Sequence, residues 1–330
     1  MAEPQSDRGV AETRLVGDIG GTNARFGLVR PDGTLLHSAI LADTEFPDIA
    51  AAIRAYLADR GDLPMPRAGA LAIAAPITGD QVRMTNHPWI FSAKGLRGDL
   101  DFERLEVIND FTAQALALPH LGDGDKEKIG GGMGVAGRPL AVLGPGSGLG
   151  VSGLVWAGDG APRRWLPLTG EGGHATMPPA DPRESAVLAY MHRHFDHVSA
   201  ERCLSGPGLI NLYNALAALD GVPAAAYTAA QITDAATGAA DPLCHEATTM
   251  FCAMLGTAAG NLAMTLGAQG GVFIAGGIVP RLGDRFAASP FRARFESKGR
   301  MSVYLTAIPT YVVTHKLPAF LGCAAALNDG

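Results

Sequence analysis

The chain has 330 residues, of which 47% are hydrophobic and 18% are charged. This length predicts about two domains with a cleft between them, and this composition excludes an intrinsically disordered chain. The net charge of −6 offers no basic face to nucleic acid or to an anionic membrane, so we expect small-molecule partners and neither nucleic acid nor membrane.

The cysteines and the apolar tracts bear on two further questions, metal or redox sites and membrane association. Cys203, Cys244, Cys252 and Cys323 lie far apart without a CxxC pair, so they predict buried side chains rather than a zinc or redox site. The polar start MAEPQSDRG lacks the apolar run of a signal peptide, and we expect a cytoplasmic protein. Glycine and polar residues interrupt the apolar tract 262–279, which favours a core helix and strand over a membrane span.

The first third of the chain predicts strands joined by glycine turns. Residues 13–40 indicate three consecutive antiparallel strands, with turns at Gly20-Gly21 and at residues 31–33. The further elements expected before residue 120 are a helix over 47–60, strands over 68–76, 81–85 and 104–108, and a helix over 112–118. The last of these strands carries Asn109 and Asp110 at its end.

The rest of the chain begins with the best linker candidate, residues 122–137, which are rich in glycine and charge. Strand, glycine turn and strand then recur over residues 140–156, a weak internal duplication. The later expected elements are a helix starting near Ser205, a long helix over 244–266, a strand over 272–275, the turn Gly276-Gly277 and a helix from Val279. We therefore predict a small domain over 1–121, completed by a helix over 315–330, and a large domain over 122–314.

Glycine turns at strand ends are the main chemical signal. The tract from Gly17 and Asp18 through Ile19, Gly20, Gly21 and Thr22 lies between two strands, so it is neither a Walker loop nor a dinucleotide fingerprint. Its backbone N–H groups can still cradle phosphate, with Asp18 holding magnesium through water. The alternative is that the glycine pair only supplies the positive φ of a hairpin. Two further glycine turns at strand ends favour phosphate binding.

These tracts resemble a known family. GDIGGTNARFGL, LGPGSGLG and IAGGIVPR are similar to the phosphate and adenosine loops of the actin, hexokinase and Hsp70 ATPase superfamily. MTNHPW, VINDFTA, GEGGH and HVSAERCLSGPGL narrow the resemblance to the bacterial glucokinase family over essentially the whole chain. It implies an α/β, two-lobed actin-like ATPase fold with duplicated ribonuclease-H-like cores and an inter-lobe cleft. It also assigns ATP contacts, which are Asp18, Gly20, Gly21, Thr22, Gly146, Ser147, Gly148, Gly276 and Gly277.

Phosphoryl transfer to a hydroxyl needs a carboxylate that accepts the proton, and Asp110 at the end of a strand suits this role. The alternative is that Asn109 and Asp110 cap the following helix. The resemblance makes Asp110 the catalytic base and assigns glucose hydroxyls to Asn109, Asp110, Glu171, His174 and Glu201. Without it, His174 is a solvated loop residue, and Glu201 is an ion-pair partner of Arg202 or a charge at a helix end.

The resulting hypothesis is a glucokinase that uses ATP with Mg²⁺ to phosphorylate the 6-hydroxyl of glucose. No closely spaced cysteine group follows His174, so we predict no zinc. Open alternatives are a kinase of another hexose, a polyphosphate-dependent enzyme and a non-catalytic sugar sensor. No helix-turn-helix precedes the first strand, which argues against a sensor of the repressor type. The family resemblance also favours a homodimer.

Overall fold

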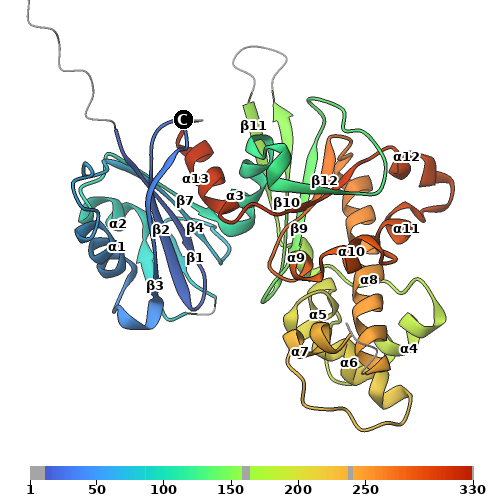
Figure 1. Cartoon of the computed structure of the whole chain (residues 1–330). Helices are drawn as coiled ribbons and strands as arrows, with labels where there is room; N and C mark the ends of the chain where they lie inside the picture. Colours follow the sequence, from blue (N-terminus) through green and yellow to red (C-terminus); the bar gives the residue numbers. More distant parts are fainter. Residues whose placement is uncertain (1–11, 86, 158–163, 237–240, 329–330) are drawn as a thin grey trace, which may run out of the picture. The chain divides into compact units, whose positions relative to one another are not determined.

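The computed structural model describes residues 12–85, 87–157, 164–236 and 241–328. The chain divides into two compact units (Figure 1): unit 1 comprises residues 1–120 and 316–330, and unit 2 comprises residues 121–315. Each unit is an α/β assembly built on its own mixed sheet. Helix α13, at the C-terminal end of the chain, therefore belongs to unit 1.

Unit 1 begins with the predicted antiparallel meander. Its strands are β1 (Arg14–Ile19), β2 (Asn23–Val29), β3 (Leu35–Ala42), β4 (Ala68–Ile73), β5 (Gln81–Arg83), β6 (Ile90–Ser92) and β7 (Arg104–Asn109). Its helices are α1 (Ile49–Ala58), α2 (Ala93–Asp99), α3 (Asp110–Ala117) and α13 (Pro318–Asn328). The main sheet has the order β3-β2-β1-β4-β7, in which β1, β4 and β7 run parallel.

Both faces of this sheet are buried, as the period-two pattern of its strands requires. Leu15 and Leu71 point into the cluster that includes Ile53 of α1, whereas their neighbours Val16 and Ala70 point to Phe320 of α13. Helix α13 also packs against α3. A Cβ on Gly322 would collide with the carbonyl of Ala113, so glycine permits this close crossing.

Unit 2 contains a six-stranded sheet and most of the helices. Its strands are β8 (Lys126–Ile129), β9 (Leu140–Pro145), β10 (Leu149–Ala157), β11 (Arg164–Thr169), β12 (Gly271–Ile274) and β13 (Thr310–Val313). Its helices are α4 (Pro182–Met191), α5 (Ala200–Cys203), α6 (Gly206–Leu219), α7 (Ala229–Ala235), α8 (Pro242–Leu266), α9 (Val279–Leu282), α10 (Asp284–Ala287), α11 (Phe291–Glu296) and α12 (Ser302–Thr306).

The two sheets repeat one topology. The order β11-β10-β9-β12-β13 reproduces β3-β2-β1-β4-β7, with two antiparallel pairs followed by two parallel pairs in each. The glycine turns between β1 and β2 and between β9 and β10 occupy the same place in each copy. The weak duplication read from the glycine turns is therefore a repeat of the whole five-stranded core.

The linker prediction for residues 122–137 needs correction. Lys126–Ile129 form β8, which pairs antiparallel with β13 at the edge of the unit 2 sheet. Ile129 is buried, and its carbonyl accepts a hydrogen bond of 2.6 Å from the hydroxyl of the buried Thr310. Because β8 is an edge strand, it buries only one side chain, and its other residues are charged. The hydrophobic pattern that predicts a strand is therefore missing from its sequence.

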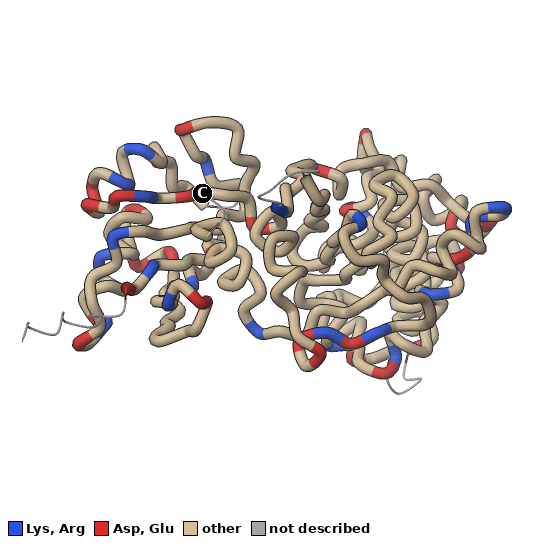
Figure 2. Tube along the Cα trace, turned by 90° about the horizontal axis from the view of Figure 1, so that it is seen from above, with Lys and Arg blue, Asp and Glu red and all other residues tan. Residues whose placement is uncertain are grey.

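Helix α8 is the longest apolar element, and it lies in the core of unit 2. Among the described residues it is the one helix long and apolar enough to cross a membrane, but 61% of its apolar window is buried in the protein. All four cysteines are buried and unpaired, as predicted. Figure 2 shows acidic and basic residues interspersed along both units.

Candidate functional site

In unit 1, the parallel register brings the first glycine turn and Asp110 to one edge of the sheet. Ile19 at the end of β1 pairs with Ile73 of β4, which in turn pairs with Asn109 at the end of β7. Two strand spacings therefore separate the β1 and β7 backbones here, or roughly 10 Å. The carboxyl ends of parallel strands are where α/β proteins commonly bind ligands.

Asp18 points out near the end of β1, opposite Arg25 of β2. The Arg25 Nη1 atom lies 3.2 Å from Asp18 Oδ2, and the Asp18 side chain is 26% exposed. Burial raises the pKa of Asp18, and the charge and hydrogen bond of Arg25 oppose that rise. A carboxylate held beside a turn rich in N–H groups is a suitable acceptor for the water ligands of Mg²⁺.

The turn after β1 is compact and partly exposed. The Gly20 N–H donates to the Asn23 carbonyl at 3.1 Å, while Gly21 is half-buried and Thr22 is exposed. Gly20 does not have the left-handed φ that a tight hairpin would demand of it. Gly17 and Ile19 are buried within β1; a Cβ on Gly17 would lie 2.6 Å from Leu71. Gly17 and Ile19 therefore anchor the turn through the buried end of β1.

Asn109 is the N-cap of α3, which bears out the capping alternative for this residue. Its Oδ1 accepts from the N–H groups of Phe111 at 2.9 Å and Thr112 at 3.2 Å, and its Nδ2 donates to the Ala75 carbonyl. Asp110 is the first residue of α3, and its Oδ1 also accepts from Phe111 N–H at 2.9 Å. These bonds fix the backbone that carries the Asp110 carboxylate.

A second carboxyl is buried behind the same turn. The Asp43 N–H donates to the Thr22 carbonyl at 3.1 Å, and neither carboxyl oxygen of the fully buried Asp43 has a partner in the described part of the chain. His87 Nδ1 is likewise buried without a partner there. Burial raises the pKa of Asp43, and the nearby His87 opposes the rise. The sequence patterns gave no signal for this pair.

We expect Asp43→Asn to stabilise the protein at neutral pH. Folding raises the pKa of Asp43 above its unfolded value of about 4. The protein therefore loses stability as the pH rises above that unfolded value, because the folded state must then bury a charge. The variant should melt roughly 2–4 °C higher at pH 7, the shift that about 1 kcal/mol causes. The gain should vanish near pH 4. An equal gain at both pH values, or the same gain in the exposed control Asp62→Asn, would disprove the burial argument.

In unit 2, the turn between β9 and β10 is clamped by Glu201. Glu201 Oε2 accepts the Leu149 N–H at 2.8 Å, and a Cβ on Gly148 would come within 2.5 Å of that oxygen. Gly146 accepts from the Gly206 N–H at the start of α6, also at 2.8 Å, and Ser147 is exposed at the tip. The predicted sugar carboxylate is thus bonded directly to the predicted phosphate turn.

The loop that carries Glu171 and His174 reaches the same turn. Gly172–His174 form a single 3-10 turn, in which the His174 N–H donates to the Glu171 carbonyl at 3.0 Å. A Cβ on the buried Gly173 would collide with the carbonyl of Leu149. The Ala200 N–H, next to Glu201, donates to the Ala175 carbonyl, next to His174, at 2.8 Å. Glu171 and His174 are exposed, so both can meet a ligand.

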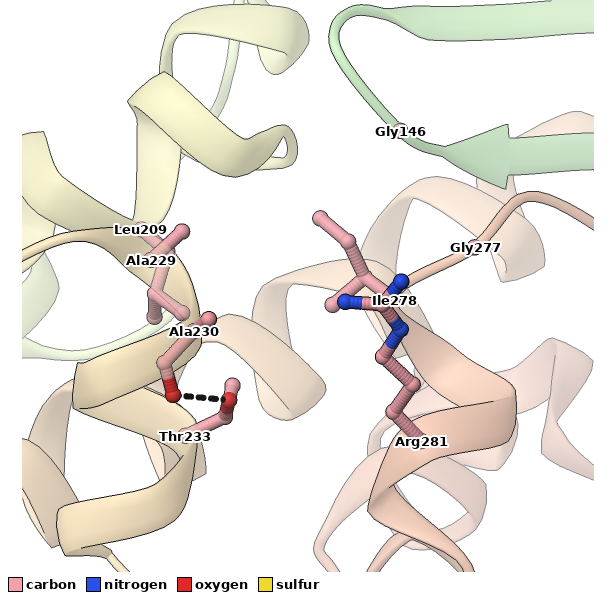
Figure 3. A pocket seen from close by; sticks show the side chains of 8 residues that line it. All are labelled: Gly146, Leu209, Ala229, Ala230, Thr233, Gly277, Ile278 and Arg281. Carbon is pink, nitrogen blue, oxygen red and sulfur yellow. Dashed lines mark hydrogen bonds between the residues drawn. The ribbon is translucent and has the colours of Figure 1, made fainter.

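The third glycine turn borders a pocket in unit 2. Gly276 has φ +81°, and a Cβ on it would collide with the Pro145 carbonyl, so it packs against the end of β9. The pocket has a volume of about 220 Å³. Figure 3 shows it between Ala229, Ala230 and Thr233 of α7, with Leu209, on one side and Ile278 and Arg281 on the other; Gly146 and Gly277 complete its lining.

The walls of this pocket suit an adenine ring. Apolar side chains face it from α6, α7 and Ile278, while Arg281 supplies a planar cation that can stack on a base. Gly146 of the predicted phosphate turn between β9 and β10 also lines this pocket, so the pocket and that turn are adjacent. The sequence analysis singled out Gly146 and Gly277, and Leu209 and Arg281 lie within its quoted tracts without an assigned role. It gave no signal for the α7 wall, because small apolar side chains such as Ala229 and Ala230 carry no chemical signature.

Metal-ligating side chains do not cluster in threes anywhere in the described residues. The magnesium role predicted for Asp18 stays a prediction. The absence of a zinc site stays a prediction.

Comparison with known proteins identifies the family. A family model described as Glucokinase matches residues 15–330, and a glucokinase of Aromatoleum aromaticum (strain DSM 19018 / LMG 30748 / EbN1) is 52% identical over 96% of this chain and 95% of its own length. The chain belongs to the bacterial glucokinase family. A glucokinase of Paramagnetospirillum magneticum (strain ATCC 700264 / AMB-1) is 50% identical over 96% of this chain and 97% of its own length.

A solved structure agrees with these relatives. The crystal structure of glucokinase from an Antarctic psychrotroph has a TM-score of 0.87 and 36% identity, covering 97% of this chain and 99% of that one. The predicted α/β, actin-like ATPase fold and the predicted family are confirmed. Membership makes the protein an ATP-dependent hexose phosphotransferase of the glucokinase type.

Proposed function

We propose that this protein transfers the γ-phosphoryl group of ATP to the 6-hydroxyl of glucose, with Asp110 as the general base. The register that aligns Ile19, Ile73 and Asn109 carries the proposal, because it sets the first phosphate turn and Asp110 at one edge of the sheet. Unit 1 contains the proposed base, Asn109 and the first phosphate turn. Unit 2 contains Glu171, His174 and Glu201, the second turn and the proposed adenine pocket.

Asp110 accepts the proton of the 6-hydroxyl as the hydroxyl oxygen bonds to the γ-phosphorus and the bond to the ADP oxygen breaks. Mg²⁺, when bound, neutralises charge on the phosphate oxygens. Asp18 would hold it through water, and the N–H groups around Gly20-Gly21, Thr22 and Gly146–Gly148 would orient the phosphates. The Phe111 N–H donates to Asp110 Oδ1 at the start of α3 and so keeps the Asp110 carboxylate in place.

Glucose is recognised by Asn109, Glu171, His174 and Glu201. Carboxylates accept from sugar hydroxyls and imidazole bonds both ways, whereas Asn109, whose Oδ1 accepts from Phe111 and Thr112, keeps one Nδ2 N–H to donate. Epimers leave some of these groups without partners. Glu201 Oε2 is occupied by Leu149 N–H, which leaves Oε1 for a hydroxyl. The exposed Glu171 and His174 lie on the loop tied to the start of α5.

Glu171→Gln and His174→Ala should raise the KM for glucose at least about tenfold and the KM for ATP far less, since each removes a hydroxyl contact outside the nucleotide pocket. Steady-state kinetics with each substrate varied in turn measures both constants. Equal increases for the two substrates would indicate that the loop is structural.

The adenine pocket favours ATP over polyphosphate, which has no base to fill 220 Å³ between α7 and Ile278. A coupled assay should scan glucose, mannose, fructose and N-acetylglucosamine against ATP, ADP and polyphosphate. Glucose with ATP should give the highest kcat/KM. Turnover confined to another pair would overturn the proposal. We also propose a cytoplasmic homodimer, which sedimentation and cell fractionation can test.

A further inference from the structure

A second pocket in unit 2 is lined by residues of α8, α9 and α10. Its volume is about 320 Å³, within the range of small-molecule sites. One wall is a stripe of α8 at helical spacing, formed by His245, Thr248 and Thr249. The opposite wall contains Arg285 of α10, and α7 contributes Ala236 just beyond its end.

The chemistry of this pocket is that of an anion site. None of its described lining residues is acidic, although the chain as a whole has a net charge of −6. Arg285 uses Nη1 for the Thr233 carbonyl at 2.7 Å, and its other N–H groups make no hydrogen bond with a described residue. Thr248 Oγ1 is buried without a partner in the described part of the chain. A buried hydroxyl without a partner destabilises the protein, and a ligand acceptor would relieve that cost.

We propose that this pocket binds a small phosphate monoester, held by Arg285, His245, Thr248 and Thr249. Guanidinium, imidazole and hydroxyl donors converging on one cavity are the groups that phosphate oxygens require. The volume exceeds that of a phosphate ion and leaves room for a small organic part. The site stands on these contacts alone and does not depend on the roles assigned to Asp110 or Glu201.

The pocket also connects to the adenine site. Arg285 holds the carbonyl of Thr233, and Thr233 and Ala230 of α7 also line the proposed adenine pocket. A phosphate bound to the other N–H groups of Arg285 therefore acts on the side chain that holds α7. Binding in this pocket should change the affinity for ATP, because two ligands that bias one element are coupled.

The test is calorimetric titration of the full-length protein with inorganic phosphate and with glucose 6-phosphate, each at saturating non-hydrolysable ATP analogue so that the phosphate turns are filled. At least one probe should bind to wild type, and Thr248→Val or His245→Gln should weaken it about tenfold, the effect of one hydrogen bond to a charged group. Thr248→Val removes a hydroxyl without a partner and should keep or raise thermal stability. Arg97→Gln, an exposed change in unit 1, should bind like wild type.

The same variants separate this pocket from the active site. The bound probe should shift the apparent KM for ATP in wild type and Arg97→Gln, but not in Thr248→Val or His245→Gln. If neither probe binds at saturating analogue, or if all four proteins bind alike, the proposal is overturned. A failure of phosphate binding in this pocket would not contradict the proposed glucose phosphorylation. Absence of glucose phosphorylation would likewise not contradict phosphate binding measured by calorimetry.

Discussion

Asp110→Asn should leave the protein folded and able to bind glucose while lowering kcat by roughly 10²–10⁴-fold, the usual contribution of a positioned general base. Asparagine keeps the Oδ1 atom that accepts the Phe111 N–H at 2.9 Å, so the start of α3 should be unchanged. Only the ability to take the proton is lost. The measurement is steady-state kinetics with ATP and glucose, beside glucose binding by calorimetry and thermal melting.

The control is Asp62→Asn, which removes an exposed carboxylate from the same unit and should keep wild-type kinetics. If Asp110→Asn retained kcat within a few-fold, Asp110 would not be the base. A loss of kcat accompanied by an equal loss of thermal stability would reduce the residue to a structural role in α3.

Gly148→Ala should impair glucose binding although Gly148 lies in the phosphate turn. The new methyl would stand 2.5 Å from Glu201 Oε2, which must then leave the Leu149 N–H and turn away from the sugar. Losing that charge-assisted bond costs about 1.5–3 kcal/mol, so we expect the KM for glucose to rise about 10- to 100-fold. The KM for ATP should rise as well, because the turn loses its clamp.

Gly146→Ala is the matched control in the same turn. A Cβ there meets nothing within 4 Å, so it should affect the KM for ATP alone. A double-mutant cycle with Glu201→Ala isolates the contact: adding Gly148→Ala to Glu201→Ala should cause little further loss in glucose KM, since the clashing carboxylate is gone. Additive losses would show that Gly148 and Glu201 act independently.

The sequence predicted the elements of the fold that depend on hydrophobic periodicity and on glycine and proline turns. The meander β1–β3, helix α1 and helix α8 follow from alternation and helical spacing. The helix predicted over 47–60 begins at Ile49 because the side chain of Asp48 caps it. The family motifs led to the fold itself. The linker prediction over 122–137 was wrong because β8 buries little besides Ile129, and glycine and charge hide such an edge strand.

The sequence indicates candidate site residues where a residue type carries the chemistry. It does not indicate the residues whose role depends on packing in the folded protein. Gly146 and Gly277, which the sequence singled out, line the pocket of about 220 Å³, but Ala229 and Ala230 in its α7 wall resemble the residues of any helix. The orphaned carboxyl of Asp43 follows from burial, which the local pattern DTEF does not reveal. The bond between Glu201 and Leu149 joins residues 52 positions apart, beyond any local signal.

The most direct test of the central claim is the ³¹P and ¹³C NMR spectrum of the product formed from ATP and glucose by wild type and by Asp110→Asn. Wild type should convert the pair to ADP and glucose phosphorylated at the 6-hydroxyl, and Asp110→Asn should form the same product at least about a hundredfold more slowly. Phosphate on another hydroxyl, release of free phosphate in its place, or equal rates in the two proteins would contradict the account.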